Sequence, residues 1–516
     1  MADGDTRGTG QTGRGFADLS AAESIEWESL PTTQPRLARP APVSAPRSTA
    51  TIPWLSRETL ARQAPFALVF ALAIFLLTLN VATPWHSSHE DNGLVFESAA
   101  VNHIRFGLGF TKGQDYFDAS VNPPIITASS IHPRGVSDAR EFQYLLTGPA
   151  QPDLYDHHPP LLGLTVAASL VTFGYQFWTV RLVPIVFTLV ALTLFYLLMT
   201  LLFRSRRLAV FAALLFITFP IAAYYGRDVS HEAPTMCCEI GMALCYALWR
   251  RRRGAHAQDG MRDDRWLIGV AACVALGMAY GWPMLFFAWL LLALDTLQAR
   301  RLDWRLGLAT GGVVTLMFVL VVAQIAWADG WSLGTLREAF FLRSTSYGAD
   351  PHGFQLYEWV KRILHHNVLD YGPWTWLALP AALVFLWRRF QREGLTLRIQ
   401  LIALFGLGGM THMLVFREGA YVHDYWQFYL IPFYAALLGW GGCELARLLA
   451  HHPLATQLLR SPNARQVALL CAFAVLALVM GAPLIYHLYA GGSLLHFPGT
   501  EPVTPIGSVR LPRGSL

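Results

Sequence analysis

The chain has 516 residues, of which 54% are hydrophobic and 14% are charged. Soluble domains carry about 25% charged residues, so this composition excludes an ordinary soluble enzyme and indicates a polytopic, all-α membrane protein. The formal net charge is +5, but most arginines lie in short clusters between apolar runs, where they control topology. The charge therefore does not indicate nucleic-acid binding. The six cysteines lie in or near apolar runs without CxxC spacing, so neither a disulfide framework nor a zinc site is indicated.

By composition the chain divides into three expected parts. Residues 1–60 are rich in Gly, Thr, Ala, Pro and Arg without a sustained apolar period, which predicts a disordered cytosolic tail. Residues 61–490 contain the long apolar runs and predict one transmembrane domain. Residues 491–516 follow the last run and predict a C-terminal tail outside the cytosol.

Long apolar runs recur through residues 61–490. A spanning helix needs roughly 20 mainly apolar residues. Runs near this length, each predicting one crossing, lie at about 65–83, 178–203, 208–224, 234–249, 266–280, 283–297, 305–327, 373–388, 398–416, 425–446 and 466–488. One further run, Pro159–Phe173, is shorter and begins with two prolines.

Positive charge orients these runs, because Arg and Lys near helix ends stay in the cytoplasm. If Pro159–Phe173 does not cross, the arginine clusters after it fall on the cytosolic side. We therefore expect this run to be a juxtamembrane or half-inserted helix on the outer leaflet. The resulting prediction is about eleven transmembrane helices in the plasma (inner) membrane, with the N-terminus cytosolic and the C-terminus outside.

On this topology the polar chemistry collects in the outside loops. The first loop, 84–177, is expected to carry juxtamembrane helices, and shorter loops lie at 224–234 and 417–424. A long loop at 329–372 has apolar residues at helical spacing, which predicts an amphipathic surface helix. The residues of that pattern are Leu333, Leu336, Phe340 and Phe341.

Two carboxylates, Glu90 and Asp91, follow the first apolar run. After Asn92 and Gly93, apolar residues continue to Ile104 and predict a short helix along the membrane. A carboxylate at the N-terminus of that helix stays ionised because this helix end is positive, and a general base must be ionised. A solvated loop carboxylate is the plainer alternative for either acid taken alone.

The second loop is dense in charge. Arg227, Asp228, His231 and Glu232 fall within one short hairpin between two apolar runs. These residues are candidates for substrate contact. Before any context is considered, a solvated turn explains them equally well.

The end of the first loop carries Asp156, His157 and His158 before two prolines. Pro at a helix start needs no amide partner, so the first free amides point outward and, with His157 and His158, could receive a phosphate. A helix cap with interfacial histidines is the alternative. Adjacent histidines do not share a helix face, so no metal site is predicted.

Three more cationic side chains, Arg343, Arg417 and His423, lie in outside loops where positive charge is sparse. An anionic lipid or a phosphate headgroup would explain them. Ordinary headgroup contact is the alternative for each one alone.

Taken together, these stretches resemble the GT-C class of integral-membrane glycosyltransferases. The resemblance is greatest to glycosyltransferase family 39, which includes protein O-mannosyltransferases and aminoarabinose transferases acting on lipid A. It covers about residues 60–490. The stretches that carry it are His89–Gly93, Tyr155–Leu161, Tyr224–Pro234 and His423–Pro432.

The resemblance implies a sugar donor on a polyprenyl phosphate and an acceptor that is a lipid, a glycan or a protein, next to membrane lipids. Asp91, or else Glu90, would deprotonate the acceptor hydroxyl, and displacement would invert the anomeric carbon. Glu232 would orient the acceptor or the sugar. The phosphate would lie near His157, His158, Arg227, His231, Arg343, Arg417 or His423. No cofactor is required, and a divalent metal is compatible with the scheme but not indicated.

Two other classes of protein remain open from the sequence. A polytopic transporter or lipid flippase would place charges near the bilayer midplane, where this chain has only Glu239 and Asp295 as notable exceptions. An assembly subunit with inert loops is the other. Charge concentrated in the outside loops favours catalysis at the membrane surface.

Overall fold

The computed structural model describes residues 57–83, 91–118, 152–155, 157–255, 264–344, 356–453, 456 and 461–490. Glu90, Asp156, nearly all of the predicted tail 1–60 and the tail 491–516 lie outside these residues. By internal contacts the chain divides into Met1–Thr59 and Leu60–Leu516. The architecture below is that of the second unit, together with the first helix.

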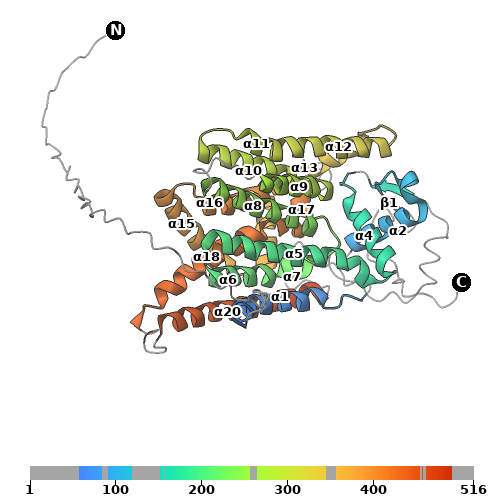
Figure 1. The fold of residues 1–516 in the computed structure, drawn as a ribbon. Helices are drawn as coiled ribbons and strands as arrows, with labels where there is room; N and C mark the ends of the chain where they lie inside the picture. The colour runs from blue at the N-terminus through green and yellow to red at the C-terminus, as the bar shows by residue number, and fades with distance from the viewer. Residues whose placement is uncertain are drawn as a thin grey trace, which may run out of the picture. The chain divides into compact units, whose positions relative to one another are not determined.

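The described residues are almost entirely helical (Figure 1). Each apolar run expected from the sequence forms helix, because straight-chain and aromatic apolar side chains can pack all round a buried or lipid-facing helix. The bundle helices are α1 (Arg57–Thr78), α5 (Phe177–Phe203), α6 (Arg206–Thr218), α8 (Glu232–Ala255), α9 (Arg265–Tyr280), α10 (Pro283–Ala299), α11 (Trp304–Gly307), α12 (Val313–Ala328), α15 (Thr375–Glu393), α16 (Leu397–Val415), α18 (Ile431–Leu449) and α20 (Pro462–Ala490).

Three of the expected runs are interrupted rather than continuous. Phe219 is extended between α6 and the short α7 (Pro220–Tyr225), because Pro220 cannot continue the ladder of α6 and instead starts a new helix. A π-helical segment, η2 (Leu308–Gly312), joins α11 to α12. A 3-10 segment, η3 (Asp424–Leu430), precedes α18. These breaks place polar backbone at the ends of apolar runs.

One end of the bundle, the loop end, carries the elements between the long helices. These are α2 (Asp91–Thr111), β1 (Asp115–Asp118), β2 (Pro152–Tyr155), α4 (Leu161–Phe173), α13 (Gly334–Ser344), α14 (Leu356–Tyr371) and α17 (Arg417–Val422). β1 and β2 pair antiparallel, with Asp115 opposite Tyr155. The helices α2 and α13 confirm two sequence predictions, whereas the β1–β2 pair and α14 were not predicted.

The helices and strands of the first loop pack closely against one another. α2 packs on α4 and on β1, and the three lie together in Figure 1. Gly163 of α4 faces the carboxylate of Asp115, and a Cβ at this position would overlap it. Asp115 is buried and is bound by His103 of α2, with Nε2 and Oδ1 3.1 Å apart. The glycine thus lets α4 lie directly over the buried hydrogen bond between His103 and Asp115.

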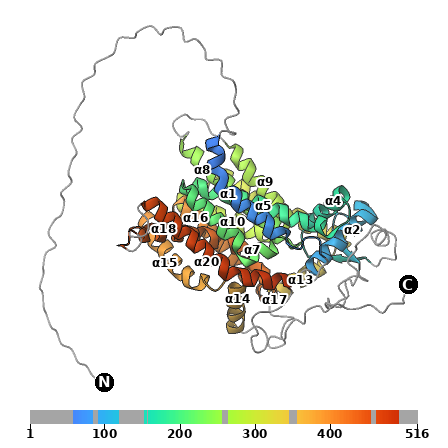
Figure 2. The same cartoon turned by 90° about the horizontal axis from the view of Figure 1, so that it is seen from below.

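The last helix ties the first helix to the loop end. The hydroxyl of Tyr489 in α20 donates to the carbonyls of Leu76 in α1 (2.6 Å) and Ala223 in α7 (3.1 Å). In both views α20 runs beside α1 (Figure 2). The segment that follows α1, and leads toward Asp91, is therefore anchored by residues from the far end of the sequence.

Among the described residues, five segments are long and apolar enough to cross a membrane by length and composition, and further apolar helices are shorter. The five are Phe177–Phe203, Trp304–Ala328, Leu397–Val415, Asp424–Leu449 and Pro462–Tyr489. The count of eleven crossings stays a prediction. With 13 residues, α4 is roughly 20 Å long, less than the roughly 30 Å hydrocarbon core, which supports the expectation that it does not span.

Candidate active site at the loop end

The N-terminus of α2 lies against the loop that precedes α8. The side-chain amide of Asn92 donates to Asp228, with Nδ2 and Oδ2 3.4 Å apart. One helical turn further on, the ring of Phe96 packs edge-on against His231, with centroids 4.8 Å apart. These contacts bring Asp91, the first residue of α2, beside the second loop.

Three histidines meet at this point. The rings of His158 and His231 stack with centroids 4.6 Å apart and planes 14° from parallel. The ring of His157 lies 4.7 Å from that of His158, and Tyr155 packs against both. The sequence placed these three histidines in one site, and the structure brings them together from two loops far apart in the chain.

Backbone contacts fix the segment that carries His157 and His158. The indole of Trp282 donates to the carbonyl of His157 at 2.9 Å. The amide of Gln114 donates to the carbonyls of Tyr155 and His158, each at 2.9 Å. The chain bends at His157 and His158 before the two prolines that lead into α4.

The histidines are neutral in the free protein. Burial, together with the charges of nearby Arg343 and His231, lowers the pKa of His157 to about 3. Burial likewise lowers the pKa of His231 to about 4 and that of His158 well below its usual value. A neutral imidazole can donate one N–H to a phosphate oxygen, but it supplies no positive charge. The charge must come from an arginine.

Arg343 of α13 is an arginine whose charge acts on both His157 and His158. Its guanidinium binds the buried carboxylate of Glu418 in α17, with Nη1 and Oε2 2.9 Å apart, and it keeps part of its surface exposed. His423 also acts on His158 from the start of η3. Arg417, by contrast, is exposed, and no described contact ties its side chain to the histidines.

Arg227 is buried and has a structural role in addition to any contact with substrate. Its guanidinium donates to the carbonyl of Leu79 and lies 4.2 Å from the ring centroid of Tyr489. Arg181 of α5 makes a parallel contact, donating to the carbonyls of Val81 (2.9 Å) and Thr83 (2.5 Å). Two buried arginines thus hold the turn after α1, just before the predicted base.

Arg181 was not identified from the sequence. It lies one turn into a long apolar helix, where a lone arginine is indistinguishable from an interfacial charge. The available signal was its isolation, because a charged side chain within a membrane helix marks a functional or structural contact.

Glu232 is the first residue of α8 and is buried. Burial raises its pKa to about 7, against a lowering effect of the nearby Ser230. The carboxyl therefore changes charge near neutral pH, which is the property required of a group that moves or holds a proton. The charge of Glu232 also acts on Tyr429 of η3.

A second polar cluster at the loop end was missed by the sequence reasoning. The hydroxyl of Tyr225 donates to Asp424 Oδ1 at 2.8 Å, and the amide of Tyr425 donates to the same oxygen. Asp370 of α14 is buried nearby, with neither oxygen hydrogen-bonded within the described chain. Burial and then the charge of Asp424 raise the pKa of Asp370 well above its usual range. The three-residue spacing of Asn367 and Asp370, which places both on one face of α14, was the sequence signal that could have indicated this cluster.

Within the described residues, no three His, Cys, Asp or Glu side chains converge as metal ligands. What the site offers is a cation, neutral imidazoles and carboxyls of different proton affinity at the end of a helical bundle. These groups suit binding of a phosphorylated substrate and transfer of a proton.

The structure is similar to two solved membrane proteins. ArnT from Cupriavidus metallidurans, solved with undecaprenyl phosphate bound, has a TM-score of 0.53 and 12% identity, over 83% of this chain and 71% of ArnT. The oligosaccharyltransferase AglB from Archaeoglobus fulgidus, in complex with an inhibitory peptide and dolichol-phosphate, has a TM-score of 0.51 and 14% identity. That match covers 83% of this chain and 56% of AglB, so the chain spans little more than half of this relative.

These likenesses define the fold as that of the GT-C integral-membrane glycosyltransferases, which confirms the fold expected from the sequence. Residues 157–327, about a third of the chain, match the family model of dolichyl-phosphate-mannose-protein mannosyltransferases. The matched part runs from His157 through α12 and includes the stacked histidines and Glu232. No curated protein matches the chain.

Proposed function

We propose that this protein transfers a sugar from a polyprenyl-phosphate donor to an acceptor hydroxyl at the extracytoplasmic face of the membrane. The stacking of His158 on His231 beside Arg343 is the observation that carries the proposal, because it joins the predicted phosphate site to the loop that holds Glu232. The polyprenyl phosphate and dolichol-phosphate bound to ArnT and AglB support this class of donor.

The chemistry follows from the groups at the loop end. Asp91, or Glu90 beside it, accepts the proton of the acceptor hydroxyl as its oxygen attacks the anomeric carbon. The bond from that carbon to the phosphate oxygen breaks, and the polyprenyl phosphate leaves with the electron pair. A single displacement inverts the anomeric configuration. Arg343 and the imidazole N–H groups of His157 and His158 stabilise the charge that develops on the leaving phosphate.

The remaining groups of the site position the substrates. Glu232 at the start of α8 orients the acceptor or the sugar, and its charge sets the pH range in which it does so. Arg227 and Arg181 hold the turn after α1, so the base remains beside the second loop. The acceptor is a lipid, a glycan or a protein.

The test uses full-length protein in detergent with a polyprenyl-phosphate sugar labelled in the sugar, and it measures release of polyprenyl phosphate with each acceptor class. We expect Asp91→Asn to lower the rate by about 100-fold or more. Glu338→Gln, an exposed acid of α13, is the matched control and should leave the rate unchanged. Transfer that survives Asp91→Asn would remove Asp91 as the base. If the wild type consumes no donor with any acceptor, a transporter or flippase becomes the better assignment.

A further inference from the structure

A pocket of about 410 Å³ lies between α5, α8 and α16, far from the loop end. Its walls hold three arginines from three different helices or their ends: Arg204, Arg251 and Arg398. The other lining residues are Leu201, Leu202, Phe203, Thr396 and Leu397, so no carboxylate lines it. Arg251 is roughly 28 Å along α8 from Glu232, at about 1.5 Å per residue, so this pocket is separate from the candidate active site.

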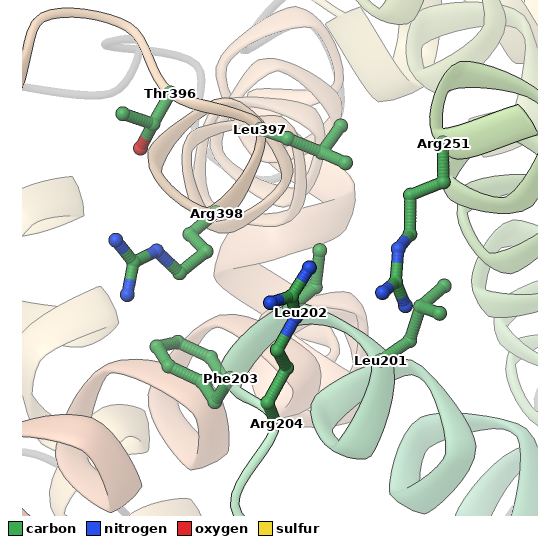
Figure 3. A pocket seen from close by; sticks show the side chains of 8 residues that line it. All are labelled: Leu201, Leu202, Phe203, Arg204, Arg251, Thr396, Leu397 and Arg398. Carbon is green, nitrogen blue, oxygen red and sulfur yellow. The ribbon is translucent and has the colours of Figure 1, made fainter. Parts of the chain in front are cut away.

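Two of the arginines have no described partner for their charge. Within the described chain, the side chains of Arg204 and Arg251 make no hydrogen bond or ion pair, and both residues are exposed. Figure 3 shows the guanidinium groups of Arg204 and Arg251 directed into the same space, whereas the guanidinium of Arg398 points away from them. Like charges that share a pocket repel one another, and a bound anion removes that repulsion.

The third arginine is held in place. Arg398 binds Glu393, with Nη2 and Oε2 3.3 Å apart, and its guanidinium lies 5.8 Å from the ring centroid of Phe203 and 5.6 Å from that of Trp440. A guanidinium held between rings loses little freedom when a ligand binds, so it offers preorganised positive charge.

The backbone around the pocket also favours an anion. α16 begins at Leu397, and the side chain of Thr396 does not cap its first amides. The hydroxyl of Thr396 has no hydrogen-bond partner among the described residues. Uncapped amides at a helix N-terminus attract phosphate. Arg204 adopts φ 50°, a left-handed conformation that an L side chain takes up only at a cost.

We propose that this pocket binds the phosphate headgroup of an anionic lipid. Arg204, Arg251 and the first amides of α16 take the phosphate, while Leu201, Leu202, Phe203 and Leu397 provide apolar surface for the start of the acyl chains. On the predicted topology this end of the bundle faces the cytosol, so the ligand is a lipid of the inner leaflet.

The experiment is native mass spectrometry of the full-length protein in detergent, titrated with phosphatidic acid, phosphatidylglycerol or phosphatidylcholine. We expect one saturable site for the two anionic lipids, with weaker binding of phosphatidylcholine. Arg204→Gln with Arg251→Gln should weaken that site at least tenfold. Arg206→Gln with Arg388→Gln removes the same charge from exposed residues outside the pocket and should change binding less than twofold.

Three results would overturn the proposal. Unchanged binding by the pocket variant would exclude the site, and equal losses in both double variants would reduce it to general attraction between arginines and headgroups. Displacement of phosphatidic acid by inorganic phosphate at similar concentration would identify the ligand as soluble phosphate instead of a lipid. An unchanged melting temperature shows that the pocket variant is folded, and Arg204→Gln alone, at an exposed position, repeats the test if the double variant is unstable.

Discussion

The ring of His158 stacks on that of His231 at 4.6 Å, joining the start of α4 to the start of α8. Both residues precede helices, and burial lowers the pKa of both rings, which favours their neutral form. The contact therefore acts through shape and N–H donation instead of charge. It also couples the two loops that hold the proposed phosphate contact and Glu232.

Replacing His158 separates the stacking from the hydrogen bonding. His158→Phe keeps an aromatic ring against His231 but removes both nitrogens, so we expect an unchanged melting temperature and a loss of about 10- to 100-fold in polyprenyl-phosphate release. His158→Ala loses the ring as well and should also melt at a lower temperature. A fully active His158→Phe protein would show that the nitrogen does not contact the substrate.

The pH dependence of transfer should come from Glu232. Its pKa of about 7 means that the carboxylate is lost as pH falls through 7. If the ionised form orients the substrate, kcat/KM should fall about tenfold for each pH unit below 7. Glu232→Gln should be slower above pH 7 and should lack this limb. A limb of the same midpoint in Glu232→Gln would assign the titration to another group.

The same residue predicts the pH dependence of stability. The pKa of Glu232 rises from 4.5 to about 7 on folding, so the folded protein binds the extra proton between these values. The contribution of this group to the free energy of unfolding is therefore greatest below pH 4.5. It falls by about 3 kcal/mol as the pH rises from 4.5 through 7. Glu232→Gln should raise the melting temperature at pH 8 relative to wild type and change it little at pH 5. An equal effect at both pH values would contradict the raised pKa.

The sequence predicted the parts of this fold that depend on local pattern. The apolar runs at 178–203 and 466–488 contain enough hydrophobic side chains to form helix wherever they pack, and the acid at the start of α2 follows from helix-end chemistry. The first and second loops were predicted to lie on the same side of the membrane, so Asp91 could be expected near the second loop.

Other features depend on tertiary contact and had no local signal. α14 mixes charged and aromatic residues, so its sequence did not predict a helix. In the structure, α7 and η3 pack against its buried face. The β1–β2 pair joins segments separated by a stretch outside the described residues. Arg227 was predicted to contact phosphate. The structure shows that its guanidinium donates to the carbonyl of Leu79, a contact that the sequence did not indicate. Its contact with substrate stays a prediction.

Arg181 should be essential for the turn after α1. Arg181→Met keeps the length of the side chain but leaves the carbonyls of Val81 and Thr83 without their charged donor, which we expect to cost about 2–4 kcal/mol of unfolding free energy. Transfer should fall as well, because the base then loses its fixed position. Thermal unfolding in detergent measures the first effect. Arg206→Gln, exposed at the start of α6, is the control and should be neutral.

Asp370 and Asp424 should respond differently to removal of charge. The pKa of Asp370 is well above its usual range because the carboxyl is buried and faces the charge of Asp424, which favours its protonated form. Asp370→Asn keeps that neutral shape and should leave the melting temperature within about 2 °C of wild type. Asp424→Ala removes the acceptor of the Tyr225 hydroxyl and the Tyr425 amide and should cost about 1–3 kcal/mol. If Asp370→Asn is the more damaging change, Asp370 is ionised and a cation must lie against it, which would make this cluster a binding site in its own right.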